Sequence, residues 1–279
     1  MIGTSKPQDR IMDRTLLRSK FIKRFSSDPE TIRDIRDIEK IEQIDADERF
    51  PCQSPNEALI LASQAFPKAT AISFLPNGSM SDIPINWTYK EYQEEVYRAA
   101  NMFHSLGLRP DQSVIFLLPN VPQFLFGLWG AQLAGIAAPI NPYLEVEHIA
   151  SIAKSANAKI LVTLAPSQPG GEDLWNKAIK AKSIASDIQQ IIVIGDSQDD
   201  YSSSWDQATR AQPSDRLIFD RPISGTEIAS YFHTGGTTGA PKLAQHTHRR
   251  QVLNVCQMQM TGPRAVSYTH LTLPTKQDV

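Results

Sequence analysis

The segment from Thr234 to Lys242 combines small, flexible and hydroxyl-bearing residues with a single cation. Its members are Thr234, Gly235, Gly236, Thr237, Thr238 and Gly239, followed by Ala240, Pro241 and Lys242. Glycine lets the backbone approach a ligand closely and point successive amides at anionic oxygens. Threonine hydroxyls add donors without charge, and lysine supplies a compact ammonium group. The composition therefore predicts a loop that binds polyphosphate.

Two better-known phosphate loops do not fit this segment. A Walker A loop needs Gly-Lys-Ser/Thr in sequence. Here Ala240 and Pro241 separate Gly239 from Lys242, and Leu243 follows. The glycine spacing is also not that of a dinucleotide fingerprint. A surface loop rich in small residues, without a ligand, is the alternative interpretation.

The chain around this loop alternates apolar strands with helices. Thr88 and Glu91 have the spacing of a helix capping box. Continuous apolar strands alternating with helices predict an α/β fold, with a mostly parallel sheet flanked by helices. In such folds ligands bind at the carboxyl ends of the strands. The predicted strands are 113–119, 136–142, 159–164, 189–195 and 227–233, and the main helices between them are 122–135, 145–158 and 173–185. The polar stretch 196–215 is predicted to be a loop.

Composition excludes several classes of protein. The net charge of −2 and the pI of about 6.3 give no basic face for nucleic acid. Cys52 and Cys256 are far apart without metal-ligand spacing, so we expect idle thiols in a cytoplasmic protein and no metal site. No charge occurs over 112–144, but Pro119 and Pro122 divide that run into pieces too short to span a bilayer.

Residues 1–50 form a charged N-terminal extension, and Pro51 marks the expected boundary. Residues 1–25 are basic with interspersed apolar residues, so this arm either lies in solvent or contacts an anionic membrane surface. Over 26–50, isoleucines recur at intervals of three. An α-helix repeats every 3.6 residues, so this stripe winds around the helix and predicts short helical pieces instead of a coiled coil.

The sequence HTGGTTGAPK, residues 233–242, resembles the phosphate-loop signature of the adenylate-forming superfamily, usually YTSGTTGxPK. His248-Arg249, INWTYKEY and LLPNVPQFLFGLWGAQLAGIAAPINP also resemble segments of that superfamily, in the same order. The resemblance covers residues 51–262, a partial AMP-binding domain. Gly235 and Leu243 stand where the signature usually has Ser and Gly, and neither change removes the amide cradle or the cation.

This resemblance implies the N-terminal part of an AMP-forming acyl-CoA synthetase that uses ATP, Mg²⁺ and CoA to activate a fatty or other apolar acid. Thr234 to Gly239 and Lys242 would bind phosphates, with protein side chains holding no metal. His248 would lie beside the acyl-adenylate or shape the acid pocket, unless it is a core histidine. A peptide-synthetase adenylation domain and a non-catalytic fragment that binds nucleotide weakly are the alternatives.

The resemblance also implies segments for adenine, ribose and a lid lysine that this sequence does not contain. We therefore expect that this chain alone does not form an adenylate. Residues 263–279 match nothing expected at that place, and we interpret them as a non-native tail.

Overall fold

The structure, a computed structural model, describes residues 19, 33–197, 202–234 and 242–261. The chain divides into two compact units. One comprises residues 52–251 and contains the sheet; the other comprises the described residues before Cys52 and after Gln251. The division falls after Pro51.

The larger unit is built on a seven-stranded sheet of order β7-β6-β5-β3-β4-β8-β9. Every neighbouring pair is parallel except β8 and β9, which are antiparallel. A separate antiparallel pair is formed by β1 (Thr70–Phe74) and β2 (Ile85–Thr88). The strands of the main sheet are β3 (Ser113–Phe116), β4 (Ile136–Pro139), β5 (Ala158–Leu164), β6 (Gln190–Ile194), β7 (Ser202–Ser204), β8 (Ile228–His233) and β9 (Leu243–Thr247).

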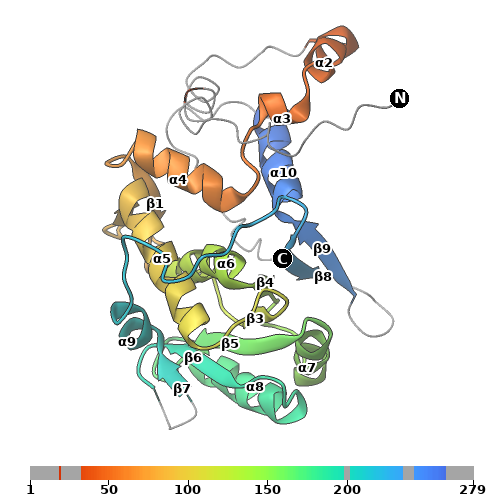
Figure 1. The fold of residues 1–279 in the computed structure, drawn as a ribbon. Coiled ribbons are helices and arrows are strands. Elements are labelled where there is room, and N and C mark those ends of the chain that lie inside the picture. The colour runs from red at the N-terminus through yellow and green to blue at the C-terminus, as the bar shows by residue number, and fades with distance from the viewer. Residues whose placement is uncertain (1–18, 20–32, 198–201, 235–241, 262–279) are drawn as a thin grey trace, which may run out of the picture. The chain divides into compact units, whose positions relative to one another are not determined.

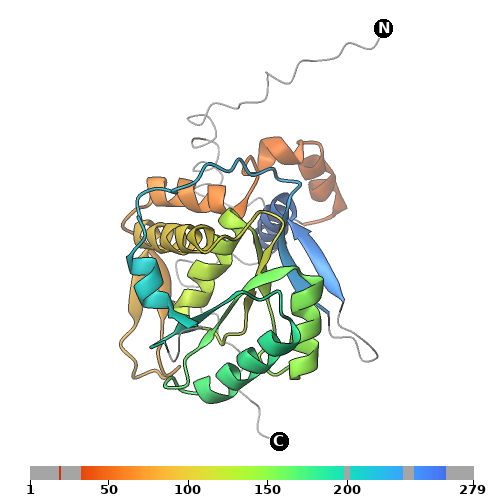
Figure 2. The same cartoon turned by 60° about the horizontal axis from the view of Figure 1, so that its bottom comes forward.

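Helices cover both faces of this sheet (Figures 1 and 2). On one face α6 contacts β3 and β4, α9 contacts β6 and β7, and α5 packs on both helices; α7 and α8 pack together against β5 on the other face. The helices are α4 (Pro55–Ala65), α5 (Tyr89–Ser105), α6 (Pro122–Ala134), α7 (Val146–Ser155), α8 (Gly171–Ile184), α9 (Trp205–Arg210) and α10 (His248–Thr261). The predicted α/β class, with a mostly parallel sheet between helices, is confirmed.

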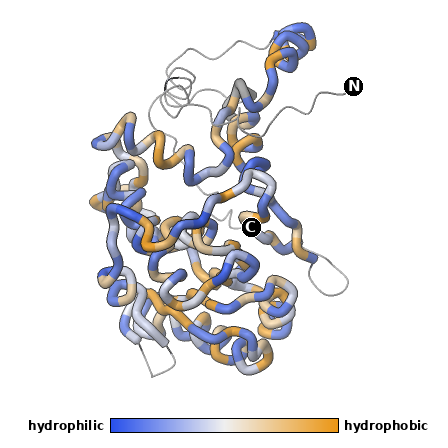
Figure 3. The backbone as a smooth tube through the Cα atoms, viewed as in Figure 1, coloured by the Kyte–Doolittle hydropathy of each residue, from blue (hydrophilic) through white to orange (hydrophobic). Residues whose placement is uncertain are grey.

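The core lies along the central strands. All four residues of β3 are buried, as are nearly all residues of β5 and β6. Figure 3 shows hydrophobic colouring along these central strands. Strands covered by helices on both faces need apolar side chains on both sides, which explains why these segments are apolar without alternation.

Local signals fix the start and end of α5. The Thr88 side chain accepts from the Glu91 amide, and the Glu91 carboxylate accepts from the Thr88 amide, so the predicted capping box is present. The helix ends at Ser105, and Gly107 follows with φ of 82°. A positive φ is readily adopted only by glycine, which explains the stop at this place.

A glycine sets how closely α5 and α6 approach. A Cβ added at Gly130 would lie 2.7 Å from Ala99 Cβ and 2.8 Å from the Ala100 amide nitrogen. Gly130→Ala must therefore push the two helices apart, and we expect the free energy of unfolding in urea to fall by about 2 kcal/mol. Gly78→Ala is the control, because nothing lies within 4 Å of the added Cβ and only the positive φ opposes it, at about 1 kcal/mol. Equal losses for both variants would contradict the close packing.

The prediction of a loop over 196–215 is wrong in its middle. Ser202–Ser204 form β7, which pairs in parallel with β6, and Trp205–Arg210 form α9. The strand β7 forms because its backbone pairs with β6, and a run of serines gives no signal of such pairing. The helix α9 is held in place by Trp205, which is 2% exposed. Likewise β3 ends at Phe116, three residues before the end of the predicted strand 113–119.

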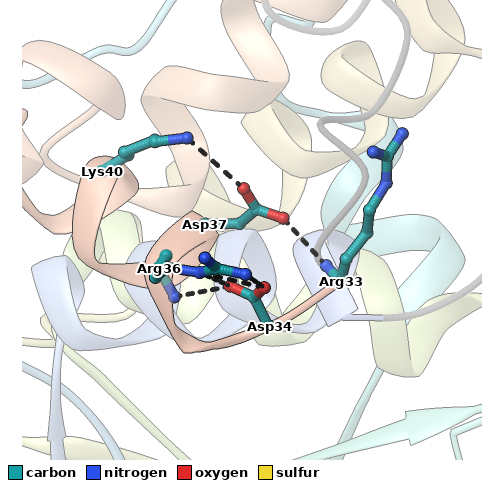
Figure 4. Close-up of polar contacts among 5 residues, drawn as sticks. All are labelled: Arg33, Asp34, Arg36, Asp37 and Lys40. Atoms are coloured by element: carbon teal, nitrogen blue, oxygen red, sulfur yellow. Dashed lines mark hydrogen bonds and ion pairs between the residues drawn. The ribbon is translucent and has the colours of Figure 1, made fainter.

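The smaller unit contains α2 (Ile35–Glu42) and α3 (Ala46–Arg49). Figure 4 shows how charged side chains support the first of them. Asp34 caps the helix by accepting from the Arg36 amide and also pairs with the Arg36 guanidinium at 2.6 Å. Asp37 accepts from the Arg33 amide and lies 3.8 Å from Lys40 Nζ. No residue of α2 is buried.

Among the described residues, no helix combines the length and apolar character needed to cross a bilayer. The basic segment 1–25, for which membrane contact was considered, lies outside the described residues apart from residue 19.

Candidate nucleotide site

The candidate loop connects the two antiparallel strands at the edge of the sheet. Phe232 pairs with Ala244 and His233 with Leu243. The hairpin is extended by one bond, because the Thr234 amide donates to the Lys242 carbonyl at 2.9 Å. The two ends of the loop are therefore held together by backbone pairing. This arrangement places the loop at the carboxyl end of β8, the edge where α/β sheets bind ligands.

The predicted phosphate-binding residues divide into those at the ends of the loop and those within it. Thr234 and Lys242 are exposed, at the two ends. The Lys242 ammonium makes no hydrogen bond or ion pair with another described residue, so it is available to an anion. Gly235, Gly236, Thr237, Thr238 and Gly239 lie outside the described residues.

A polar cluster, most of it buried, holds β8, the strand that leads into the loop. Ser230 of β8 accepts hydrogen bonds from Gln132 Nε2 at 2.9 Å and from Gln251 Nε2 at 3.0 Å. Gln132 Nε2 also donates to Gln251 Oε1 at 3.2 Å. The cluster joins α6, β8 and α10, and it was not predicted. The available signal was Gln132 itself, which with Gln123 is one of two polar residues in a helix that is otherwise apolar.

A second connection runs through Arg221, whose side chain is 11% exposed. Its guanidinium pairs with the Glu227 carboxylate at 2.8 Å and donates to the Leu133 carbonyl at 3.1 Å. Glu227 in turn accepts from the Ser224 amide at 2.8 Å. An almost buried arginine needs such partners, since an unpaired buried charge is strongly destabilising. The pair therefore fixes the segment just before β8 against the end of α6.

His248 begins α10 directly after β9, and its side chain is fully buried. Neither ring nitrogen has a hydrogen-bond partner among the described residues. Burial, with a smaller contribution from the Arg221 cation, lowers the pKa of His248 to about 4, although the Glu227 carboxylate opposes the shift. The imidazole is therefore neutral at pH 7 and enclosed by protein. In this arrangement a ligand would reach it only if its surroundings opened.

One half-buried histidine at this edge was missed. His233, the last residue of β8, accepts a hydrogen bond at Nε2 from the Asn141 amide, which follows β4. The donor and acceptor are 92 residues apart, and the N–Nε2 distance is 3.0 Å. Sequence offers one signal for such a contact, namely a polar residue at the end of a buried strand.

Taken together, these features define an α/β domain of the kind found at the N-terminus of adenylate-forming enzymes, with the candidate segment 234–242 between β8 and β9 at the sheet edge. The chain matches the family of AMP-binding enzymes over residues 61–275. It belongs to that family, which confirms the resemblance of the loop sequence. The matched range includes part of 263–279, the proposed non-native tail, which lies outside the described residues.

The relatives that it resembles are acid–CoA ligases. It is 44% identical over 259 residues to a marinolic acid–CoA ligase of Pseudoalteromonas sp. (strain SANK 73390), covering 93% of this chain and 38% of that protein. It is 33% identical over 173 residues to a crotonobetaine/carnitine–CoA ligase of Escherichia coli O17:K52:H18 (strain UMN026 / ExPEC), covering 61% of this chain and 32% of that protein. The chain thus spans about a third of the length of these relatives.

Solved structures share the fold. One is an anthranilate CoA ligase in complex with anthranoyl-AMP, with a TM-score of 0.57 and 20% identity, over 68% of this chain and 34% of that one. Another is a Mycobacterium tuberculosis fatty acyl CoA synthetase, with a TM-score of 0.54 and 22% identity, over 70% of this chain and 35% of that one. At these identities the likeness concerns the fold alone.

Proposed function

We propose that this chain is the N-terminal part of an AMP-forming acid–CoA ligase, and that its share of the reaction is to hold the phosphates of ATP. The observation that carries the proposal is the hairpin at the carboxyl end of β8, which joins Thr234 to Lys242 and leaves the Lys242 ammonium without a partner among the described residues. The relatives are CoA ligases by name, which supports CoA over a carrier protein as the acceptor.

In the proposed reaction, a carboxylate oxygen of the acid attacks the α-phosphorus of ATP. The bond from the α-phosphorus to the bridging oxygen breaks, and pyrophosphate leaves. The thiol of CoA then displaces AMP from the acyl-adenylate, losing its proton, and a thioester forms. Charge accumulates on phosphate oxygens during the first step, so positioned donors and cations stabilise its transition state.

Residues of this chain would act mainly on the leaving pyrophosphate. The amides of 235–239 and the hydroxyls of Thr234, Thr237 and Thr238 would donate to phosphate oxygens, and Lys242 would neutralise charge. Mg²⁺ would come with the nucleotide and offset negative charge on its phosphates. For His248 we propose a part in shaping the acid pocket and not in proton transfer, because its ring is enclosed and neutral.

For the acid we propose a molecule with an apolar body. The segment 112–144, which forms β3, α6 and β4 next to β8, contains no charged residue. This segment would therefore contribute no counter-ion for a charged acid chain to a pocket at the carboxyl ends of these strands. A reaction that consumes ATP and CoA also supports a cytoplasmic location.

The test is calorimetric titration of the 279-residue chain with ATP and Mg²⁺. Lys242→Ala removes the cation, and we expect the dissociation constant to rise at least tenfold, the effect of one charge-assisted contact. Lys68→Ala, at another exposed lysine, is the matched control and should leave the constant unchanged. Equal affinities for wild type and Lys242→Ala would overturn the role of Lys242.

A further inference from the structure

The amides of β4 determine how it can bond to β8. The Ile136 amide donates to the Gln112 carbonyl and the Ile140 amide to the Phe116 carbonyl, so both point toward β3. Successive residues of a strand direct their N–H groups to opposite sides. The amides of residues 137, 139 and 141 therefore point toward β8, where Ala137 pairs with Ser230.

The next position on this side cannot form a bond. Residue 139 is proline, which has no N–H group, so the ladder to β8 loses its donor there. The amide after it, that of Asn141, does not bond to the β8 backbone; it donates to His233 Nε2 at 3.0 Å. Beyond Pro139, a side chain thus replaces the backbone ladder between the ends of β4 and β8.

This bond requires one form of the histidine. Nε2 must carry a lone pair to accept from an amide, so the ring is neutral with its proton on Nδ1. Burial lowers the pKa of His233, which favours that form at neutral pH. The donor side is also held in place, because Asn141 Oδ1 accepts from the Tyr143 amide at 2.9 Å.

Other titratable groups lie on the segments around this bond. Tyr231 is on the same strand as His233, Lys242 and His246 are on or next to β9, and Tyr143, Glu145, Glu147 and His148 follow β4. From α8, Lys177 donates to the Pro142 carbonyl at 3.0 Å and pairs with Asp173 at 3.0 Å. His246 packs edge-on against the Phe232 ring at 5.0 Å between centroids. Side chains of adjacent residues point to opposite faces of a strand, so His246 is on the other face from His233.

We propose that His233 is a positioning residue, whose neutral imidazole holds the start of the segment 234–242 at the end of β4 through the Asn141 amide. The next residue along the chain is Thr234, the first of the predicted phosphate donors. Holding His233 in place also restricts Thr234, so less freedom of that residue has to be lost when a phosphate binds. The affinity for ATP then depends on His233 being uncharged. Only this last consequence rests on the proposed function.

Two variants separate the hydrogen bond from the bulk of the side chain. His233→Gln keeps an acceptor at about the reach of Nε2 but cannot titrate, whereas His233→Phe keeps a ring and has no acceptor. His246→Phe is the control, because it removes a histidine from the same hairpin without touching Asn141. Each is made in the 279-residue chain.

The first measurement needs no ligand. Amide hydrogen exchange at Asn141 should be about tenfold faster in His233→Phe than in wild type at pH 8, and unchanged in His233→Gln and His246→Phe. In wild type, the protection of the Asn141 amide should be lost as the pH falls below 6.5, because a protonated ring cannot accept a hydrogen bond. In His233→Gln, whose side chain does not titrate, this pH-dependent loss should be missing. Exchange at Asn141 that is the same in all four proteins would overturn the hydrogen bond and the proposal with it.

The second measurement is the dissociation constant of ATP with Mg²⁺. We expect His233→Phe to weaken binding about fivefold at pH 8, with wild-type affinity retained in His233→Gln and His246→Phe. The protonation of ATP itself is the same in every sample. A loss of affinity at acidic pH that is larger in wild type than in His233→Gln therefore reports the protonation of His233. If Asn141 exchanges as expected but all variants bind ATP equally, the positioning role is overturned. If even wild type does not bind ATP, the proposed function fails together with that role, and the exchange data still establish the bond.

Discussion

Replacing His248 with leucine is expected to remove a large acid-induced loss of stability. The pKa of this histidine is about 4 in the folded chain, because of burial and the nearby Arg221 cation, against 6.5 for an ordinary histidine. The unfolded chain therefore binds a proton on acidification before the folded chain does. Stability from this group is complete above pH 6.5 and falls as the pH drops toward 4. The fall amounts to about 3 kcal/mol in wild type.

The measurement is the free energy of unfolding in urea between pH 7 and pH 4 for wild type and His248→Leu. At pH 7 the two should agree within about 1 kcal/mol. Both ring nitrogens lack partners among the described residues, so replacing the ring with an apolar side chain of similar size loses no hydrogen bond to them. Carboxylates titrate in both proteins, so their difference isolates His248. His148→Leu, at an exposed histidine of α7, should keep the wild-type slope. A parallel fall in wild type and His248→Leu would show that His248 is not held neutral by burial.

Asn101→Leu is expected to destabilise the chain by about 3 kcal/mol. Asn101 lies on α5 and is fully buried. Its Nδ2 donates to the carbonyls of Pro213 and Arg216 at 2.9 Å each, and its Oδ1 accepts from the Ile218 amide at 2.9 Å. Leucine keeps the volume and removes all three bonds, each worth about 1 kcal/mol. The loop that these bonds hold leads to Arg221 and β8.

The matched control is Asn56→Leu, the same change at another buried asparagine. Asn56 makes one such bond, from Nδ2 to the Trp129 carbonyl at 3.2 Å. We expect a loss of about 1 kcal/mol there. Urea unfolding at pH 7 measures both. Similar losses for the two variants would mean that burial of the amide, and not the three bonds to the loop, sets the effect at Asn101.

Features that depend on residues close together in the sequence could be predicted from it. The capping box of Thr88 and Glu91 is one, because both partners lie in the first turn of α5. The alternation of apolar strands and helices is another, since strands covered on both faces must be apolar. The glycine and threonine content of 234–239 likewise predicts phosphate binding without reference to the rest of the chain, and the resemblance to the adenylate-forming superfamily is confirmed by the family match.

The elements that escaped prediction depend on partners distant in sequence. Ser202–Ser204 have no strand-like composition, and they form β7 because the β6 backbone offers them hydrogen bonds. Trp205 then anchors α9 by burying its ring. The periodicity of apolar residues indicates which face of a helix or strand is buried. It does not indicate which other strand pairs with its backbone.

The sequence by itself therefore determined the α/β class and the order of most elements, and it supplied the prediction of a phosphate-binding loop. Only the tertiary structure decided that His248 is enclosed and uncharged, and that His233 meets the Asn141 amide where Pro139 interrupts the ladder. The physical reason is that the state of a polar side chain depends on desolvation and on hydrogen-bond partners. For both histidines these are supplied by segments that only folding brings together.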